Sequence, residues 1–145
     1  MWKSAASLVF AAMLGACVQQ TSSSKPGDEA LIEHGRYVTN SIAGCNDCHS
    51  PRLENGQPDA AHSLQGSPLP FEPVATMQGR MPWAAIAPQI AGGPADMNDE
   101  QFVRFLQTGE KPDGSRSRPP MPQFRMNAED ARSVVAYVKT RPRAR

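Results

Sequence analysis

The residues Cys45-Asn46-Asp47-Cys48-His49 constrain the fold of this chain more than any other feature of its sequence. The spacing C-x-x-C-H is the signature of covalent haem attachment. Two thiols three positions apart on one helical turn can form thioethers to the two vinyl groups of one haem. The histidine after the second cysteine then lies beneath the ring, where its imidazole can bind the iron. The motif therefore predicts a chain that wraps around a large cofactor.

Three other interpretations of the two cysteines compete with haem attachment. A thioredoxin-like C-x-x-C motif lies beside a βαβ pattern, and the sequence shows no such pattern. A zinc site needs a second pair of ligands, and only His34 and His62 remain for it. A structural disulfide is compatible with an exported chain, but export is also the setting in which bacteria join thiols to haem. Haem attachment is the preferred interpretation, and a disulfide or metal-binding lipoprotein is the weakest alternative.

The composition of the chain fits a fold with a cofactor at its centre. Of 145 residues, 14 are proline and 11 are glycine, which indicates much irregular backbone. Hydrophobic residues make up 39% and aromatic residues 6%, a modest supply for a core built from side chains alone. Lys and Arg number 15 against 14 Asp and Glu, and this balance argues against general nucleic-acid binding. Three cysteines are too few for a dense disulfide scaffold.

The first residues predict export and attachment to a membrane. Residues 1–16 are interpreted as a signal peptide, because their apolar run is shorter than the roughly 20 residues of a spanning helix. Leu14-Gly15-Ala16-Cys17 resembles a bacterial lipobox, in which cleavage before the cysteine is followed by acylation of its sulfur and new amino terminus. An ordinary signal peptide with an incidental cysteine is the alternative. Residues 17–27 are predicted to be a flexible polar tether, and residues 28–145 the folded domain.

Helical patterns recur along the rest of the chain, with no strand pattern of any length. A first helix is predicted over residues 28–41. A second begins after the capping residue Asn98 and ends at Gly109, and a last one begins after Asn127. The connecting segments, residues 51–96 with eight prolines and residues 110–125, are predicted to be long loops, the first with one short helical turn. The sequence therefore predicts an all-α fold of three or four helices joined by long loops.

The two ends of the chain resemble class I c-type cytochromes. Residues 35–50, GRYVTNSIAGCNDCHS, are similar to the family's first helix and haem motif, and residues 119–140, PPMPQFRMNAEDARSVVAYVKT, to its methionine loop and closing helix. Residues 98–122 also resemble the cytochrome c subunits of membrane-bound alcohol and aldehyde dehydrogenases. The resemblance is thin over residues 51–96. It implies the cytochrome c fold around one covalently bound haem c, held by Cys45, Cys48 and His49, with the terminal helices crossing closely at Gly35.

An iron bound by His49 has one axial position left, and Met121 is the predicted ligand there. Three prolines limit the freedom of the loop around Met121, and a stiff loop can hold a weak thioether ligand at a fixed distance. Its distance from the last helix also fits the resemblance. Met77 and Met81, in the divergent loop, are the main rivals. The remaining candidates are expected to pack in the core or to lie exposed: Met97, Met126, His34 and His62.

Several other side chains are predicted to surround the cofactor. The indole N–H of Trp83 can donate to a haem propionate, and Arg118 and Arg125 can pair with one. A solvated arginine and a packing tryptophan are the competing interpretations. The aromatic residues expected to line the core and the haem pocket are Phe71, Phe102, Phe105, Phe124 and Tyr37.

The chain is interpreted as an electron carrier rather than an enzyme, because no substrate is transformed. Its expected location is the bacterial cell envelope, lipid-anchored through Cys17 to a membrane and facing the periplasm. The expected partners are redox proteins there, a dehydrogenase whose electrons the chain accepts or a terminal oxidase, and no nucleic acid. The alternative is a haem enzyme or gas sensor with an open or labile sixth position, which needs a polar distal pocket and no tightly bound methionine.

Overall fold

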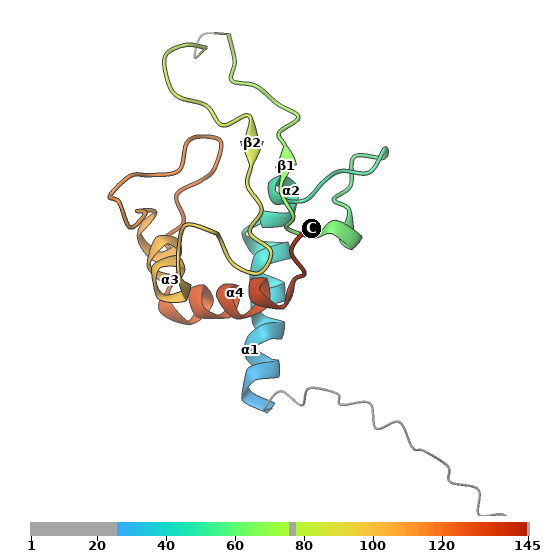
Figure 1. Cartoon of the computed structure of the whole chain (residues 1–145), viewed down its shortest axis with the longest axis vertical. Coiled ribbons are helices and arrows are strands. Elements are labelled where there is room, and N and C mark those ends of the chain that lie inside the picture. The colour runs from blue at the N-terminus through green and yellow to red at the C-terminus, as the bar shows by residue number, and fades with distance from the viewer. Residues whose placement is uncertain (1–25, 76–77, 145) are drawn as a thin grey trace, which may run out of the picture.

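The computed structural model describes residues 26–75 and 78–144 of the chain and is mostly helical. Its α-helices are α1 (Pro26–Tyr37), α2 (Cys45–His49), α3 (Asp99–Thr108) and α4 (Ala128–Thr140) (Figure 1). They confirm the predicted all-α class, and α2 is formed by the C-x-x-C-H motif itself. No helix in this described part of the chain has the length and hydropathy needed to cross a membrane.

The N-terminal predictions concern residues that the structure mostly leaves out. The signal peptide of residues 1–16 and nearly all of the tether of residues 17–27 lie outside the described residues. The helix α1 begins at Pro26, two residues before the predicted start. A proline is favourable in the first turn of a helix, because the first backbone N–H groups have no partner within the helix.

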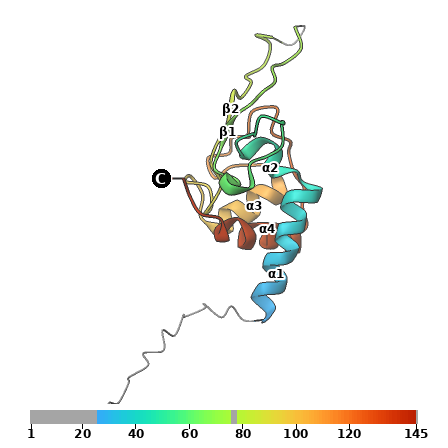
Figure 2. The same cartoon turned by 90° about the vertical axis from the view of Figure 1, so that its right-hand side faces the viewer.

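The first and last long helices, α1 and α4, cross in direct contact (Figures 1 and 2). A Cβ atom added to Gly35 would lie 1.8 Å from the carbonyl oxygen of Ser133 and 2.9 Å from Cβ of Tyr137. Only glycine fits at this point, which confirms the close crossing expected there. Beyond Tyr37 the helix continues as a π-helical turn, η1 (Val38–Ile42), rather than as the α-helix predicted up to residue 41.

The hydrophobic core is built mainly from α3 and α4. The helix α3 begins with a capping box between Asn98 and Gln101 and ends at Gly109, whose φ is 74°, as the sequence predicts. Asn127 caps α4 by accepting from the backbone N–H of Asp130. Each core side chain contributes about 1.5–3 kcal/mol by its burial. The largest contributions from these two helices come from Phe102, Phe105, Leu106, Val134, Val135 and Val138.

The segment predicted as one long loop, residues 51–96, contains more regular structure than expected. It includes a 3₁₀ turn, η2 (Ala60–His62), and two strands, β1 (Ser67–Pro68) and β2 (Ile86–Ala87), which pair antiparallel. A two-residue strand offers no alternation, so the sequence indicated no strand here. Between the strands the chain forms an extended arm, residues 69–85, described over 69–75 and 78–85. The arm projects beyond the helices (Figures 1 and 2).

Replacing Gly35 by alanine should destabilise the holoprotein by roughly 1–3 kcal/mol, because α1 and α4 must separate to admit a methyl group. Thermal or denaturant unfolding measures the change. The matched control in the same helix is Gly27→Ala, since a Cβ at Gly27 meets nothing within 4 Å. This control should leave stability unchanged or slightly increased. Equal stabilities of the two variants would contradict a tight crossing.

Candidate functional site

One cavity of about 1210 Å³ lies between α2, α3, the base of the arm and the loop after α3. It exceeds the roughly 300–1,000 Å³ of pockets for ordinary small-molecule ligands, so it has room for a large flat cofactor. The structure brings four of the predicted site residues to its wall: Cys45, Cys48, His49 and Met121. The fifth, Cys17, lies outside the described residues.

The motif forms a helix of its own because a glycine precedes it. Gly44 has a φ of 62° and a ψ of 30°, in the left-handed region that favours glycine. It turns the chain from the end of η1 into α2, and its carbonyl accepts from the N–H of Asp47 at 3.0 Å. Cys45 and Cys48 are three positions apart on this turn, so both residues reach the same cavity.

Both cysteines of the motif are protonated at neutral pH. Desolvation is the main reason that the pKa of Cys45 rises to about 11. Burial also raises the pKa of Cys48, helped by the charge of Asp47. Reactive and redox-active cysteines have lowered pKa values instead. Within residues 26–75 and 78–144, no group of three or more His, Cys, Asp and Glu side chains is placed to hold a metal ion. The thioredoxin-like and zinc interpretations therefore gain no support from the described site.

His49 lies at the cavity wall with one ring nitrogen already engaged. Its Nδ1–H donates to the carbonyl oxygen of Pro88 at 2.7 Å, and only 6% of the residue is exposed. Burial lowers the pKa of His49, and the bond to Pro88 offsets part of that effect. The ring is therefore neutral at pH 7. Because a carbonyl can only accept, the proton lies on Nδ1 and the free lone pair on Nε2, which is the nitrogen available to a metal.

The loop that supplies the Pro88 carbonyl is held from two sides. Next to the motif, the backbone N–H of Ala91 donates to the carbonyl of Leu64 at 2.9 Å. The segment after α4 makes the second contact, in which Arg143 Nη2 donates to the carbonyl of Gly93 at 2.6 Å. These contacts fix the acceptor that orients the ring of His49.

Asn46, the second residue of the motif, connects α2 to its surroundings. Its Oδ1 accepts from the hydroxyls of Ser50 at 2.6 Å and Ser63 at 2.8 Å, and its Nδ2 donates to Oδ1 of Asn40 in η1. The Ser50 hydroxyl also accepts from the backbone N–H of Leu64 at 2.9 Å. The pattern C-x-x-C-H leaves the second position unspecified, so the motif carried no signal for this role.

The methionines divide clearly by position. Met121 and Met97 line the cavity, whereas Met81 and Met126 do not. The other rival, Met77, lies outside the described residues. Met97, expected only to pack, is therefore the geometric competitor of Met121 among the described methionines.

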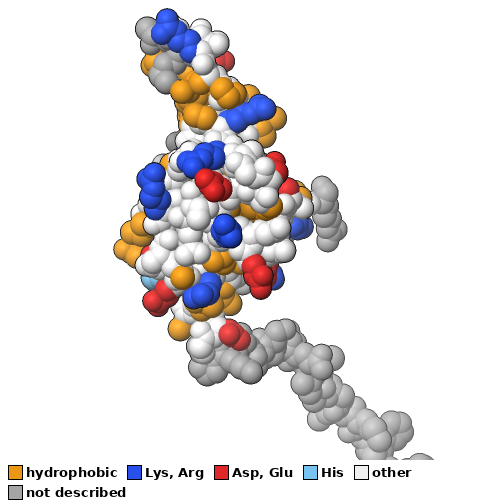
Figure 3. Space-filling model, turned by 90° about the vertical axis from the view of Figure 1, so that its left-hand side faces the viewer, with side chains coloured by type: hydrophobic (Ala, Val, Ile, Leu, Met, Phe, Trp, Pro, Cys, Tyr) orange, Lys and Arg blue, Asp and Glu red, His pale blue; other side chains and the backbone are white. Residues whose placement is uncertain are grey.

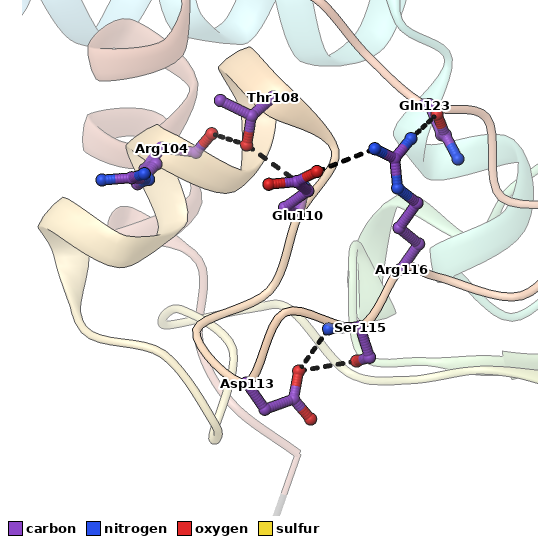
Figure 4. Close-up of polar contacts among 7 residues, drawn as sticks. All are labelled: Arg104, Thr108, Glu110, Asp113, Ser115, Arg116 and Gln123. Carbon is purple, nitrogen blue, oxygen red and sulfur yellow. Dashed lines mark hydrogen bonds and ion pairs between the residues drawn. The ribbon is translucent and has the colours of Figure 1, made fainter.

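Met121 belongs to the loop between α3 and α4, and an arginine ties this loop together (Figure 4). Arg116 donates to Glu110 Oε1 at 2.7 Å and to Gln123 Oε1 at 2.7 Å. Nearby, Oδ1 of Asp113 accepts from the N–H of Ser115 at 2.9 Å and from its hydroxyl at 2.7 Å. The prolines explain part of the stiffness of the loop. The bonds of Arg116 add to it, and no sequence pattern signals partners of this kind within an irregular loop.

Trp83 provides a test of whether haem suits this cavity. Trp83 and Arg118 line it, and Arg125 does not. The Nε1–H of Trp83 is buried without a hydrogen-bond partner in the described residues. Buried donors in folded proteins are nearly always paired, so this indole suits a ligand that brings its own acceptor. A haem propionate is such an acceptor. Together with the thiols and the imidazole in the same cavity, the residues present fit haem.

The other expected neighbours of the site are only partly in place. Phe102, Phe105 and Phe124 line the cavity as predicted. The prediction was wrong for Phe71 and Tyr37, which are 41% and 50% exposed and lie away from the cavity wall. Phe71 belongs to the projecting arm. Tyr37 lies off the face of α1 that α4 covers at Gly35, because successive helical residues point about 100° apart.

The two remaining histidines lie outside the cavity, as the sequence indicates. His34 on α1 is exposed, and its Nε2 lies 2.7 Å from Oδ1 of Asp130 at the start of α4. His62 is exposed on η2, with its Nδ1 2.6 Å from Oδ2 of Asp59. Both rings are therefore engaged with carboxylates at the surface.

Comparison with known proteins gives a consistent result. A cytochrome c family model matches residues 35–142. A "Diheme cytochrome c-type" protein of Cereibacter sphaeroides is 29% identical over 115 residues, covering 76% of this chain and 35% of that protein. The "Alcohol dehydrogenase (quinone), cytochrome c subunit" of Gluconobacter oxydans is 31% identical over 140 residues, covering 94% of this chain. The chain thus spans 35% and 26% of the lengths of these two relatives.

Asn46→Ala should destabilise the protein by about 1–3 kcal/mol, because it leaves the hydroxyls of Ser50 and Ser63 without their acceptor. It should also lower the yield of protein carrying its cofactor, since α2 loses its link to η1. Denaturant unfolding and absorbance per chain measure the two effects. Asn55 offers the control: its Oδ1 accepts one exposed backbone bond from Gln57, and Asn55→Ala should change stability by no more than about 0.5 kcal/mol. A neutral Asn46→Ala would rule out the structural role.

Proposed function

The chain belongs to the cytochrome c family, whose members transfer electrons through covalently bound haem c, and on that premise we propose that it carries single electrons through one haem from a membrane-bound dehydrogenase. The observation that carries this proposal is the single cavity whose lining includes Cys45, Cys48, His49 and Met121. The sequence contains one C-x-x-C-H motif, which supports one haem for these 145 residues.

The two cysteines and the histidine of the motif each have a definite task in the proposed carrier. Cys45 and Cys48 form thioethers with the cofactor and keep it from dissociating. His49 binds iron through Nε2, and its bond to Pro88 holds the ring in place and raises the basicity of Nε2. Haem bound in this way supplies an iron that gains or loses one electron. Trp83 offers its unpaired Nε1–H to a propionate.

We further propose Met121 as the second axial ligand. It lines the cavity, and its neighbours resemble the methionine loop of the family. The bonds of Arg116 to Glu110 and Gln123 restrain the loop, so the thioether can keep one position in both oxidation states. A thioether raises the reduction potential relative to a second histidine. A tight Met121 bond also separates the carrier from the alternative, a haem enzyme or gas sensor whose sixth position is open.

The proposed donor is a quinone-dependent dehydrogenase. The support is the relative from Gluconobacter oxydans, described as the cytochrome c subunit of a quinone alcohol dehydrogenase. A terminal oxidase is the proposed class of acceptor. In this role the chain transforms no substrate of its own and acts as the electron-accepting part of an oxidoreductase system.

We also propose that the chain is anchored in the bacterial envelope by lipid on Cys17 and faces the periplasm. The support is the lipobox-like sequence before this cysteine and the polar residues after it. Mass spectrometry of the mature amino terminus should find a chain that begins at Cys17 and carries acyl groups, and Cys17→Ser should release a soluble protein with an unchanged haem spectrum. A mature end elsewhere without lipid would overturn the anchor.

The function is tested with holoprotein made in a host that matures c-type haem. It should contain one haem per chain, retained through acid-acetone extraction, with a pyridine haemochrome spectrum of saturated vinyl groups. Washed membranes of the native host, supplied with ethanol, should reduce this haem faster than membranes without ethanol. Cys45→Ala and Cys48→Ala should sharply lower the holoprotein yield. Haem that is freely extractable would contradict covalent attachment. A reduction rate that does not depend on ethanol would contradict the proposed dehydrogenase partner.

The ligand is tested with a pair of methionine variants. The wild-type ferric protein should be low spin with a weak sulfur-to-iron band in the near infrared. Met121→Ala should abolish this band, lower the reduction potential and open the iron to cyanide or carbon monoxide. Met97→Ala, which alters the other methionine of the described cavity wall, should keep the band. The reverse result would make Met97 the ligand, and a high-spin wild type that binds carbon monoxide readily would favour the open-site alternative.

A further inference from the structure

The outer part of the arm has no role in the helical core or the cavity wall described above. At its base the two limbs are bonded to each other, because the N–H of Leu69 donates to the carbonyl of Ala85 at 2.9 Å. The base is also bonded to the body, where the N–H of Ala84 donates to the carbonyl of Pro119 at 2.8 Å. Beyond this base the two described limbs project away from the helices (Figures 1 and 2). The arm is therefore firmly rooted but carries its outer part into solvent.

The arm exposes large apolar side chains to solvent. Phe71 is 41% exposed and Val74 is 64% exposed. Figure 3 shows hydrophobic side chains along this projecting part of the molecule. Glu72 and Arg80 are the two charged residues of the arm, and their charges cancel. Exposed apolar side chains gathered on one projecting element make that element a candidate interaction site.

The root of the arm is also a wall of the cavity. Leu69, Trp83, Ala85 and Ile86 all line it. A protein that covers the arm is thereby brought beside the cavity, and electron transfer depends steeply on the distance between donor and acceptor. The arm thus joins an apolar docking element to the site at which electrons enter or leave.

We propose that the arm inserts Phe71 and Val74 into an apolar groove of the protein that exchanges electrons with this chain. This inference rests on the proposed electron-carrier function. Insertion of only two side chains suits a transient contact: stable interfaces bury about 1,600 Å² in total, and weak redox encounters lie below about 1,200 Å². An arm with two inserted side chains contributes to the second class, and this disfavours a stable dimer of two copies.

The chemistry of the arm favours a protein over a lipid surface. Anionic membranes are recognised by clusters of about 4–8 Lys and Arg residues, and the arm has only Arg80. The arm and the N-terminal end of α1 lie at opposite ends of the described molecule (Figures 1 and 2). The arm therefore lies away from the start of α1, at an end of the described molecule where a redox protein can contact it.

The test compares the holoprotein with the double variant Phe71→Ser/Val74→Ser in stopped-flow reduction by ethanol-supplied washed membranes. Both side chains lie away from the cavity wall, so the haem spectrum and melting temperature should be unchanged. The second-order rate constant should fall about ten-fold or more, because buried anchor residues each cost more than about 1 kcal/mol when truncated. Reduction by ascorbate, which needs no docking, should proceed at the wild-type rate.

Leu53→Ser is the matched control, because Leu53 is 48% exposed and belongs to neither the arm nor the cavity wall. It should leave both rates unchanged. A wild-type rate for the double variant with membranes would overturn the arm proposal while leaving the electron-carrier function intact. If ethanol-supplied membranes fail to reduce the haem of the wild type, the proposed dehydrogenase partner is wrong. The arm proposal, which depends on that partner, is then wrong as well.

Two further measurements test whether the arm contacts a lipid surface or a second copy of the chain instead of a redox protein. Cys17→Ser holoprotein is mixed with vesicles of phosphatidylcholine and phosphatidylglycerol, and sedimentation velocity is run on the same protein. We expect no vesicle binding and a monomer. Vesicle binding that the double variant loses would assign the arm to lipid instead, and a dimer that it loses would assign it to a second copy. Either result would overturn the proposal.

Discussion

The contact between Gly35 and the carbonyl of Ser133 sets the spacing on which the other elements depend. It brings α1 and α4 to backbone contact, so the chain that leaves α1 passes close to α4, where Nδ2 of Asn40 meets the hydroxyl of Tyr137 at 3.3 Å. From there Gly44 directs the chain into α2. The opposite face of α4 packs on α3, which leads to the loop of Met121. The two groups proposed as iron ligands are thus both positioned from one helix crossing.

The two sides of the cavity are held by different kinds of interaction. Around His49 the bonds run through buried or partly buried groups such as Ser50, Asn46 and the carbonyl of Pro88. Around Met121 the main polar link is Arg116, an exposed ion pair with Glu110. Exposed pairs contribute about 0.2–1 kcal/mol each and weaken as salt is added. The restraint on the methionine side therefore depends more on salt concentration than the restraint on the histidine side.

Much of this architecture could be predicted where short-range chemistry determines it. The C-x-x-C-H motif and the caps at Asn98 and Asn127 are decided by neighbours in the sequence. The crossing at Gly35 joins distant segments, and it was expected from the resemblance to class I c-type cytochromes. Asn46 and Arg116 escaped prediction because their roles depend on which distant or irregular segments meet. Met97 packs against the core as expected, and its place in the cavity lining depends on the same kind of contact. Phe71 and Tyr37 were misplaced for a related reason: an aromatic residue signals burial, but the arm and the angle of α1 decide what is covered. The ligands themselves and Cys17 stay predictions.

The hydrogen bond from Arg143 to the carbonyl of Gly93 has a consequence for the site. Arg143 lies 94 positions after His49 and close to the end of the sequence. The loop whose Pro88 carbonyl orients His49 is thus fastened by one of the last residues of the chain. A chain shortened before Arg143 would keep the whole C-x-x-C-H motif but lose this bond on the loop that orients its histidine.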